Sequence, residues 1–280
     1  MPPMATAVDY EVEVEDVEYR RLDGTPWLAR IYRPKGGTPT ATLVDVHGGA
    51  WVNGDRKNNE AVDRLLAARG MLIAALDFRQ PPEGGYPDGV ADINLGIRWL
   101  KANASKFGGS SRVGAIGNSS GGHLVALCGI RPRDPRYAAL PLEGHPDVDA
   151  SLAYVVACWP VIDPLYRFNV ARENGWQHLV EAHLSYWGSE EAMAEGAPRN
   201  ALEKGEAVDM PPMLLALKPN DKNHPQPMQD AFVEAYRKRG GSIEVAMLEG
   251  LPERGFSADG SDPANARARD VVEEFIRKHA

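Results

Sequence analysis

A serine in a glycine-rich turn is the first group in this sequence that could do covalent chemistry. The stretch GNSSGG, Gly117 to Gly122, fits the pattern G-x-S-x-G with Ser119 at its centre. Between a strand and a helix, such a turn exposes the serine Oγ at the helix N-terminus, where the helix dipole favours developing negative charge. An apolar run precedes the motif and a helical pattern follows it. Ser119 is therefore the candidate nucleophile.

A second glycine-rich stretch, HGGAW from His47 to Trp51, follows an earlier apolar run. Consecutive glycines allow backbone N–H groups to point into one cavity, which is how an oxyanion hole is built. We expect the donors to be the N–H groups of Gly48 and Gly49, with a third from Ser120. A phosphate-binding loop is the alternative. Such a loop requires an immediate helix start and a Lys or Ser/Thr at fixed spacing, and neither is present.

Strand and helix patterns alternate along most of the chain. Two alternating segments separated by LDGTP predict a hairpin at residues 10–20 and 27–33. Apolar runs predict further strands within residues 40–51, 71–78, 111–118, 150–160, 212–219 and 242–250. Helical spacing predicts helices at residues 58–69, 90–107, 120–130, 228–239 and 264–278. This alternation predicts an α/β fold with a mainly parallel central sheet, helices on both faces and an antiparallel hairpin at one edge.

Residues 161–210 interrupt this alternation, because they show a helical pattern and no strand. We expect a helical cap, inserted into a single domain of residues 1–280, over the carboxyl ends of the strands, where open α/β sheets place their sites. The alternative is a peripheral helical pair that only packs. If the segment is a cap, Trp176 and Trp187 within it, together with Trp51, would line the substrate pocket.

The composition is that of an ordinary globular protein, with 43% hydrophobic and 25% charged residues. A formal net charge of −8, without any basic stripe, argues against a nucleic-acid partner. Cys128 and Cys158 lie in apolar runs, as buried thiols do in a reducing compartment, and no Cys/His spacing resembles a zinc site. We expect no metal and no cofactor. Without a signal-peptide pattern or an apolar run of membrane-spanning length, we expect a cytoplasmic protein with no membrane partner.

The two glycine-rich motifs and their surroundings resemble the α/β-hydrolase superfamily. More narrowly, the chain is similar to the hormone-sensitive-lipase-like carboxylesterases and the related feruloyl-esterase-like group. The stretches that carry the resemblance are VDVHGGAW, LDFRQPPEGGYPDGVADINLGIRWL, GNSSGGHL and PPMLLALKPNDKNHP. The resemblance covers the chain from about Val44 to its end. It implies an α/β-hydrolase fold and a serine hydrolase that acts on a small-molecule ester.

The resemblance also implies a catalytic acid and a catalytic histidine, in the order Ser, Asp, His. The acid follows the strand after the cap, which corresponds to Asp221 in KPNDKN. The histidine should follow the next strand in a stretch of the form G-x-P-H-G-F, but the sequence there is GLPERGF. Glu253 and Arg254 occupy that stretch. A carboxylate is a weak base near neutral pH unless it is strongly desolvated, and arginine is never a base in proteins.

Another histidine must therefore replace the missing one, or the base is absent. His224 is the best candidate, because it shares the loop of Asp221. Asp221 lies only three residues before His224, a short separation for a residue that must orient its ring. Asp163 is therefore a second candidate for that role. His178 and His183, in the presumed cap, are the other candidate bases. Within this hypothesis, Arg254 would hold a substrate carboxylate through a bidentate pair.

The resulting interpretation is hydrolysis of a carboxylic ester, or of an amide or lactone, by Ser119, Asp221 and His224. Two alternatives stay open because the usual histidine is missing. One is a non-hydrolytic enzyme of the lyase or cyclase type that uses the oxyanion hole, and the other is a binding protein with impaired catalysis. In similar enzymes the last strand and helix often mediate dimerisation, so a homodimer is one of the assemblies open to this chain.

Overall fold

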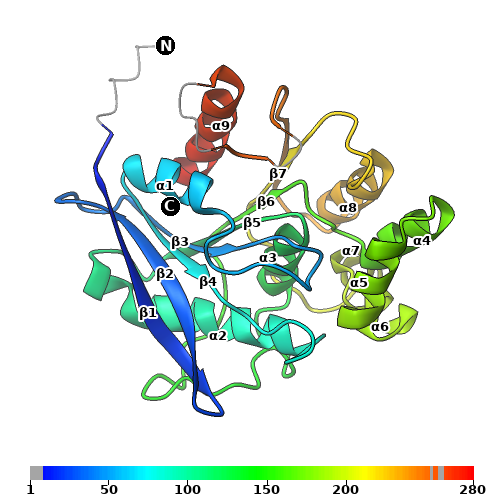
Figure 1. The fold of residues 1–280 in the computed structure, drawn as a ribbon, viewed down its shortest axis with the longest axis horizontal. Helices are drawn as coiled ribbons and strands as arrows, with labels where there is room; N and C mark the ends of the chain where they lie inside the picture. The colour runs from blue at the N-terminus through cyan, green and yellow to red at the C-terminus, as the bar shows by residue number, and fades with distance from the viewer. Residues whose placement is uncertain (1–8, 253–254, 258–261) are drawn as a thin grey trace.

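The computed structural model describes residues 9–252, 255–257 and 262–280. Within them a single sheet has eight strands in the order β1-β2-β4-β3-β5-β6-β7-β8 (Figure 1). The strands are β1 (Val12–Leu22), β2 (Thr25–Pro34), β3 (Ala41–Val46), β4 (Met71–Leu76), β5 (Val113–Asn118), β6 (Val155–Cys158), β7 (Met213–Leu217) and β8 (Ile243–Met247). The β1–β2 and β2–β4 pairs are antiparallel and all the others are parallel.

Helices cover both faces of this sheet, which confirms the predicted architecture. α1 (Glu60–Ala68) and α9 (Pro263–His279) contact each other on one face, and α2 (Asp88–Asn103) and α3 (Ser120–Ile130) contact each other on the opposite face. The core is correspondingly divided into two apolar clusters. Side chains such as Val62 and Phe275 belong to one cluster, and Ile93 and Leu124 belong to the other. Burying each such side chain contributes about 1.5–3 kcal/mol.

Local sequence explains how two of the predicted elements end. The hairpin strands continue beyond the predicted residues up to a two-residue turn at Asp23 and Gly24, whose φ values are 48° and 83°. Positive φ at both positions is the signature of a type I′ turn, for which Asp-Gly is a preferred pair. The helix predicted for residues 90–107 instead starts at Asp88 and stops at Asn103, because its last turn tightens into a 3-10 helix before Gly108.

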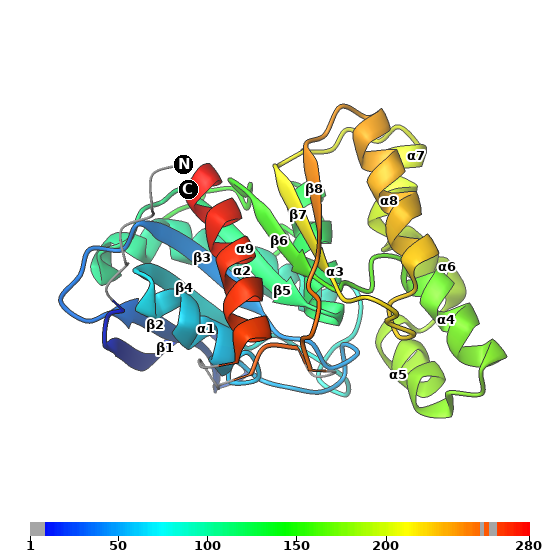
Figure 2. The ribbon, with the colours of Figure 1, turned by 90° about the horizontal axis from the view of Figure 1, so that it is seen from above.

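The segment between β6 and β7, which the structure describes in full, contains helices and no strand, as predicted. It contains α4 (Pro164–Glu173), α5 (Gln177–Trp187), α6 (Glu190–Glu195) and α7 (Pro198–Glu203). In Figure 2, α4, α5 and α6 form a group beside α8 (Gln226–Lys238), away from the β1–β2 edge. The chain enters this group directly from the carboxyl end of β6. That the group acts as a cap over a site stays a prediction.

Candidate active site

Ser119 lies at the sharp turn between β5 and α3, as its sequence context predicts. Its backbone has φ 51° and ψ −119°, in a region that costs a non-glycine residue about 1–3 kcal/mol. Backbone hydrogen bonds hold it there, because its N–H donates to the carbonyl of Cys158 at 2.9 Å and its carbonyl accepts from the N–H of Val161 at 3.0 Å. Both partners belong to β6 and the residues after it. The neighbouring strand therefore maintains the strained turn.

The motif glycines are needed because two backbones meet at this turn. A Cβ atom on Gly121 would lie 2.0 Å from the carbonyl oxygen of Val46, at the end of β3. A Cβ atom on Gly117 would lie 2.7 Å from the carbonyl carbon of Gly121. These separations are shorter than any carbon contact in a relaxed structure. The glycines therefore let α3 start directly against β3 and β5.

His224 lies within hydrogen-bond reach of the nucleophile, since its Nε2 is 3.0 Å from Ser119 Oγ. The two residues come from neighbouring parts of the sheet: Ser119 follows β5, and His224 follows β7, with β6 between them. The distance is within the range required of a general base, about 2.6–3.2 Å between heavy atoms. The structure thus brings together the serine and the histidine that the sequence analysis paired.

Asp221 binds the other side of the same imidazole ring. Its Oδ2 lies 2.9 Å from His224 Nδ1, while its Oδ1 accepts the backbone N–H groups of Asn223 at 2.9 Å and His224 at 3.2 Å. The second set of bonds is a turn in which an aspartate side chain caps its own following residues. This turn folds the chain back so that the ring reaches the second carboxylate oxygen. Asp221 therefore orients the ring of His224. The sequence-based expectation that the two residues lie too close together in the chain for this role is wrong.

Burial favours the neutral form of the histidine, and the surrounding hydrogen bonds and positive charges keep the aspartate ionised. Burial raises the pKa of Asp221, but the hydrogen bond and charge of His224, with the charge of Lys218, lower its pKa overall below the ordinary value. Lys218 Nζ lies 3.4 Å from Asp221 Oδ2, an ion pair that the sequence analysis did not predict. Burial lowers the pKa of His224, and Asp221 opposes that shift only in part. Neutral imidazole with Nδ1–H bound to a carboxylate leaves Nε2 free to accept a proton.

The glycine turn after β3 lies directly against the nucleophile. A Cβ atom on Gly48 would be 3.3 Å from Ser119 Cβ, so a larger residue would crowd the serine. His47 Nδ1 lies 2.7 Å from the carbonyl oxygen of Gly48, and its ring stacks on Phe78 at 4.6 Å. In a trans peptide the carbonyl and the following N–H point in opposite directions. Holding this carbonyl therefore turns the N–H of Gly49 away from the His47 ring.

Residues 30–188 match the sequence model of the BD-FAE family, which is more than half of the chain. The chain belongs to the BD-FAE family. It is also 31% identical over 253 residues to the carboxylesterase NlhH of Mycobacterium tuberculosis, a match that covers 85% of this chain and 73% of that protein. The resemblance to the esterases of the α/β-hydrolase superfamily is confirmed.

Other relatives agree with this family. The esterase LipC of Mycobacterium tuberculosis is 36% identical over 94% of this chain. The BD-FAE chain spans 64% of the length of LipC and 53% of the length of the probable carboxylic ester hydrolase LipM. Among solved structures, the thermophilic esterase Est2 of Thermogutta terrifontis superposes with a TM-score of 0.73 at 25% identity, over 95% of this chain and 92% of Est2. The predicted α/β-hydrolase fold is confirmed.

Two of the other candidate histidines, His123 and His183, are held in buried environments that favour the neutral ring. His123 Nε2 lies 2.8 Å from the carbonyl oxygen of Gly196, and its Nδ1 accepts from Trp51 at 3.4 Å. Burial lowers the pKa of His123 to about 4 and that of His183 to about 3. His178 is exposed on α5. Among the hydrogen bonds of the described residues, none of these three imidazole rings is bonded to the Ser119 hydroxyl, whereas that of His224 is.

Asp163 has a structural position at the start of α4. Its side chain accepts the N–H of Tyr166 at 2.9 Å, as a helix N-cap does, and pairs with Arg199 at 3.3 Å. The ring of His224 is oriented by Asp221 instead. The proposal that Asp163 orients the base is therefore wrong, because its carboxylate is already committed to the helix.

The predicted pocket tryptophans of this BD-FAE member occupy different environments. Trp51 and Trp187 are 1% and 3% exposed, and their rings meet edge to face at 5.5 Å. Trp187 also packs on Tyr86 at 4.7 Å, so the cluster joins the inserted helices to the loop before α2. Trp176 is half-buried at the start of α5. That any of the three contacts substrate stays a prediction. Arg254 and Glu253 lie outside the described residues.

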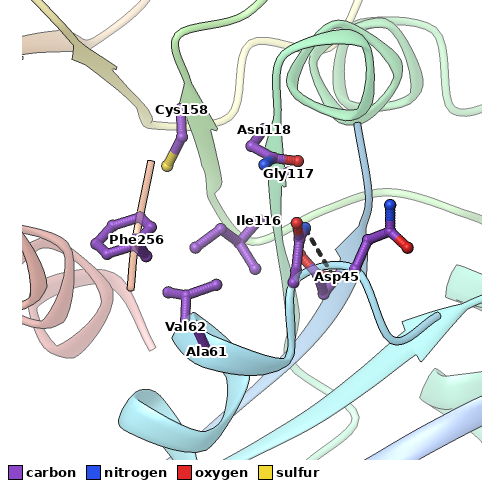
Figure 3. Close-up of a pocket in the computed structure, with 10 residues that line it drawn as sticks. Asp45, Ala61, Val62, Ile116, Gly117, Asn118, Cys158 and Phe256 are labelled. Atoms are coloured by element: carbon purple, nitrogen blue, oxygen red, sulfur yellow. Dashed lines mark hydrogen bonds between the residues drawn. The ribbon is translucent and has the colours of Figure 1, made fainter. Parts of the chain in front are cut away.

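A small cavity with a mixed polar and apolar lining lies behind the nucleophile strand (Figure 3). Its volume is about 40 Å³, and Asp45, Asn118, Cys158 and Phe256 are among the residues that line it. A water molecule needs about 10–15 Å³ of such space, so the cavity has room for a few waters but not for an ester substrate. Ala61 and Val62 of α1 also line it, which places this cavity on the face of the sheet opposite α3.

The described residues contain no group of three or more His, Cys, Asp or Glu side chains arranged to hold a metal ion. Nor does this part of the chain include a helix that is both long and apolar enough to cross a lipid bilayer. Cys128 and Cys158 are buried free thiols.

Proposed function

We propose that this chain hydrolyses carboxylic esters through an acyl-enzyme on Ser119, with His224 as the general base and Asp221 as its acid partner. The observation that carries the proposal is the hydrogen-bonded chain from Ser119 Oγ to the His224 ring, at 3.0 Å, and from the ring to Asp221, at 2.9 Å. The similarity to the carboxylesterase NlhH and the esterase LipC supports the same reaction.

The first half of the reaction forms the acyl-enzyme. His224 Nε2 takes the proton of Ser119 Oγ as that oxygen bonds to the ester carbonyl carbon, and the carbonyl electron pair moves onto its oxygen. The N–H groups of Gly48, Gly49 and Ser120 are the proposed donors to this oxyanion. When the carbonyl re-forms, the bond to the alcohol oxygen breaks, and the leaving alkoxide takes the proton from His224. Asp221 stabilises the imidazolium between the two steps.

The second half regenerates the serine. Water gives a proton to His224 and attacks the acyl carbon, and collapse of the second tetrahedral intermediate expels Ser119 Oγ, which recovers its proton from His224. The products are one alcohol and one carboxylic acid. Amides and lactones present the same acyl carbon and belong to the same reaction class.

Two alternatives have less support. A lyase or cyclase on the same fold needs no acyl-enzyme, and a binding protein needs no base. Neither alternative uses a neutral imidazole placed between the serine and a carboxylate. The relatives named above are named as ester hydrolases. We therefore keep ester hydrolysis as the conclusion.

Turnover of 4-nitrophenyl butyrate by the wild type, Ser119→Ala and His224→Ala tests the proposal. Both variants should lose at least about 10³-fold in kcat, since the remaining oxyanion hole and binding give only residual catalysis. His145→Ala is the matched control, because His145 is an exposed loop histidine. A wild type no faster than Ser119→Ala would refute ester hydrolysis. An active His224→Ala beside an inactive Ser119→Ala would place the base elsewhere.

We also propose that helices α4–α7 act as a cap over this site and that the chain works in a reducing compartment such as the cytoplasm. The cap proposal is supported by the position of these helices directly after β6, whose carboxyl end adjoins the turn of Ser119. The compartment proposal is supported by the two free thiols. A homodimer stays a prediction.

A further inference from the structure

Arg167, on α4, is a buried cation with little to balance it. Its side chain is 3% exposed, and within the described residues neither Nε nor Nη2 has a hydrogen-bond partner. No carboxylate of those residues lies within ion-pair distance of it. An uncompensated buried charge is costly, typically by several kcal/mol. Such a cation either lowers the stability of the fold or pairs with the negative charge of a bound ligand.

The guanidinium lies next to the proposed catalytic machinery. Its central carbon is 5.5 Å from the centre of the Trp51 ring, and Trp51 follows the glycine turn at Gly48 and Gly49. Its charge also reaches the other side of the site, because it lowers the pKa of His224 and is itself influenced by Asp221. Arg167 therefore packs on the ring of Trp51, the residue after the oxyanion turn and Ala50, and is close enough to Asp221 and His224 to influence their charges.

The neighbours of Arg167 do not neutralise it. Burial lowers the pKa of Arg167 to about 10, so it remains positively charged at neutral pH. His183, whose ring lies 5.0 Å from that of Trp51, is neutral, because burial and the charge of Arg167 lower its pKa to about 3. Asp221 carries a negative charge, but its oxygens are bonded to His224 and to the backbone of its own loop. The planar donors of Arg167 are left for another partner.

We propose that Arg167 binds a carboxylate carried by the ester substrate. A guanidinium held over an indole ring presents its edge, where two N–H groups can pair with the two oxygens of a carboxylate. The proposal rests on the proposed function, since it names the class of ester that the same site would take. It uses a described residue for the role that the sequence analysis gave to Arg254.

A bound carboxylate would also assist the chemical step. The positive charge of Arg167 opposes formation of the His224 imidazolium, which the proposed mechanism requires in each transition state. A substrate carboxylate paired with Arg167 cancels much of that opposition. Esters with a carboxylate should therefore have a higher kcat and a lower KM than their neutral analogues. A residue that only packs against Trp51 would produce neither effect.

Two pairs of isosteric esters test the proposal and locate the carboxylate. Monomethyl succinate and methyl succinamate differ only by carboxylate against carboxamide on the acyl side, and acetoxyacetate and acetoxyacetamide differ in the same way on the alcohol side. Acid release gives kcat/KM for each. In one of the two pairs, the kcat/KM of the wild type should be at least about tenfold higher for the carboxylate than for the carboxamide. The reason is that a site built for an ionic partner rejects the analogue that lacks the charge.

Substitutions then assign that preference to a residue. Arg167→Gln should reduce the carboxylate-to-carboxamide ratio to near one, and Arg167→Lys should retain only part of it, because lysine keeps the charge but not the forked donors. Arg172→Gln is the matched control. Arg172 lies on the same helix, with its guanidinium 5.5 Å from the Phe168 ring, but it is exposed and paired with Glu190. Its ratio should equal that of the wild type.

The outcomes are distinguishable. A wild type that hydrolyses the neutral esters but shows no carboxylate preference in either pair overturns this inference and leaves the proposed function intact. A preference that survives in Arg167→Gln also overturns it. If Arg167→Gln does not fold, Arg167→Lys decides the case, because a wild-type ratio unchanged in that variant overturns the inference. A wild type that hydrolyses neither these esters nor 4-nitrophenyl butyrate refutes the proposed function and this inference together.

Discussion

Asp221 and His224 stand three residues apart in one loop, and a 2.9 Å hydrogen bond joins Asp221 Oδ2 to His224 Nδ1. The other carboxylate oxygen accepts two backbone N–H groups of the same loop. One aspartate therefore both shapes the loop and orients the ring. This compact arrangement places an imidazole at Ser119, although the stretch after β8, where the family resemblance places the histidine, contains none in the sequence.

The dual role of Asp221 predicts the effect of Asp221→Asn. An asparagine oxygen can still accept the backbone N–H groups, but the negative charge that stabilises the imidazolium is lost. We expect kcat to fall by about 10³–10⁴-fold, with a change of less than about 1 kcal/mol in the free energy of unfolding. Ester kinetics and urea denaturation measure the two quantities. Asp230→Asn is the control, because Asp230 is exposed and its side chain accepts a hydrogen bond from Gln226, on the surface of α8.

The pH profile should report His224. Only the neutral imidazole can take the serine proton, so kcat/KM should be constant at neutral pH and fall as the pH drops through the pKa of His224. Burial puts that pKa below the ordinary 6.5, so the acid limb should lie below pH 6.5. Because the charge of Arg167 lowers this pKa further, Arg167→Gln should move the limb to higher pH. A limb above pH 6.5 in the wild type would contradict the assignment.

The close approach of α3 to β3 predicts a large effect of one methyl group. In Gly121→Ala the new Cβ would meet the carbonyl oxygen of Val46, a backbone atom that cannot rotate away. We expect a loss of about 3 kcal/mol or more in the free energy of unfolding, at the upper end of overpacking effects. Gly144→Ala is the control. Its Cβ would have open space, so only its φ of 74° is unfavourable, at about 1 kcal/mol. Equal losses in the two variants would show that the contact at Gly121 relaxes.

Much of the site could be predicted from sequence where the chemistry depends on local pattern. G-x-S-x-G between a strand and a helix located Ser119, and the alternation of strands and helices predicted the sheet that carries it. The position of His224 in the loop after β7 made it the best of the remaining histidines. That it reaches Ser119 depends on a side-chain turn with no periodic signal. Arg167 could not have been found, because nothing in LYRFNV distinguishes a buried, unpaired guanidinium from a solvated one.

The tryptophans show the same limit. Trp51 and Trp187 are far apart in sequence, and only the folded chain shows that they meet in a buried cluster. If Trp187 is a core residue, Trp187→Ala should cost about 3–5 kcal/mol of the free energy of unfolding. Trp176→Ala, at a half-buried position on the same helix group, should cost much less. Denaturation curves of both variants decide the point, and a marginal effect of Trp187→Ala would favour a pocket role instead.

The carboxyl groups of Asp45 and Asp63 predict a pH-dependent stability. Both are buried, and both oxygens of Asp63 lack a hydrogen-bond partner within the described residues. Burial raises the pKa of each, and the charges of Asp45 and Glu60 raise that of Asp63 further. A raised pKa means that the folded state holds protons that the unfolded state releases. The contribution of these two groups to the free energy of unfolding is therefore fully present below their unfolded pKa of about 3.8. It is lost as the pH rises from there through their folded pKa values.

Asp63→Asn removes the more isolated of the two carboxyl groups and should flatten this dependence. We expect the melting temperature of the wild type to fall between pH 5 and pH 8, and that of Asp63→Asn to fall less. At pH 8 the variant should exceed the wild type by at least about 2–4 °C, which corresponds to about 1 kcal/mol in a chain of this size. Asp55→Asn is the comparison, because Asp55 lies in a partly exposed loop. Parallel curves for the wild type and Asp63→Asn would mean that Asp63 is ionised and satisfied in the folded protein.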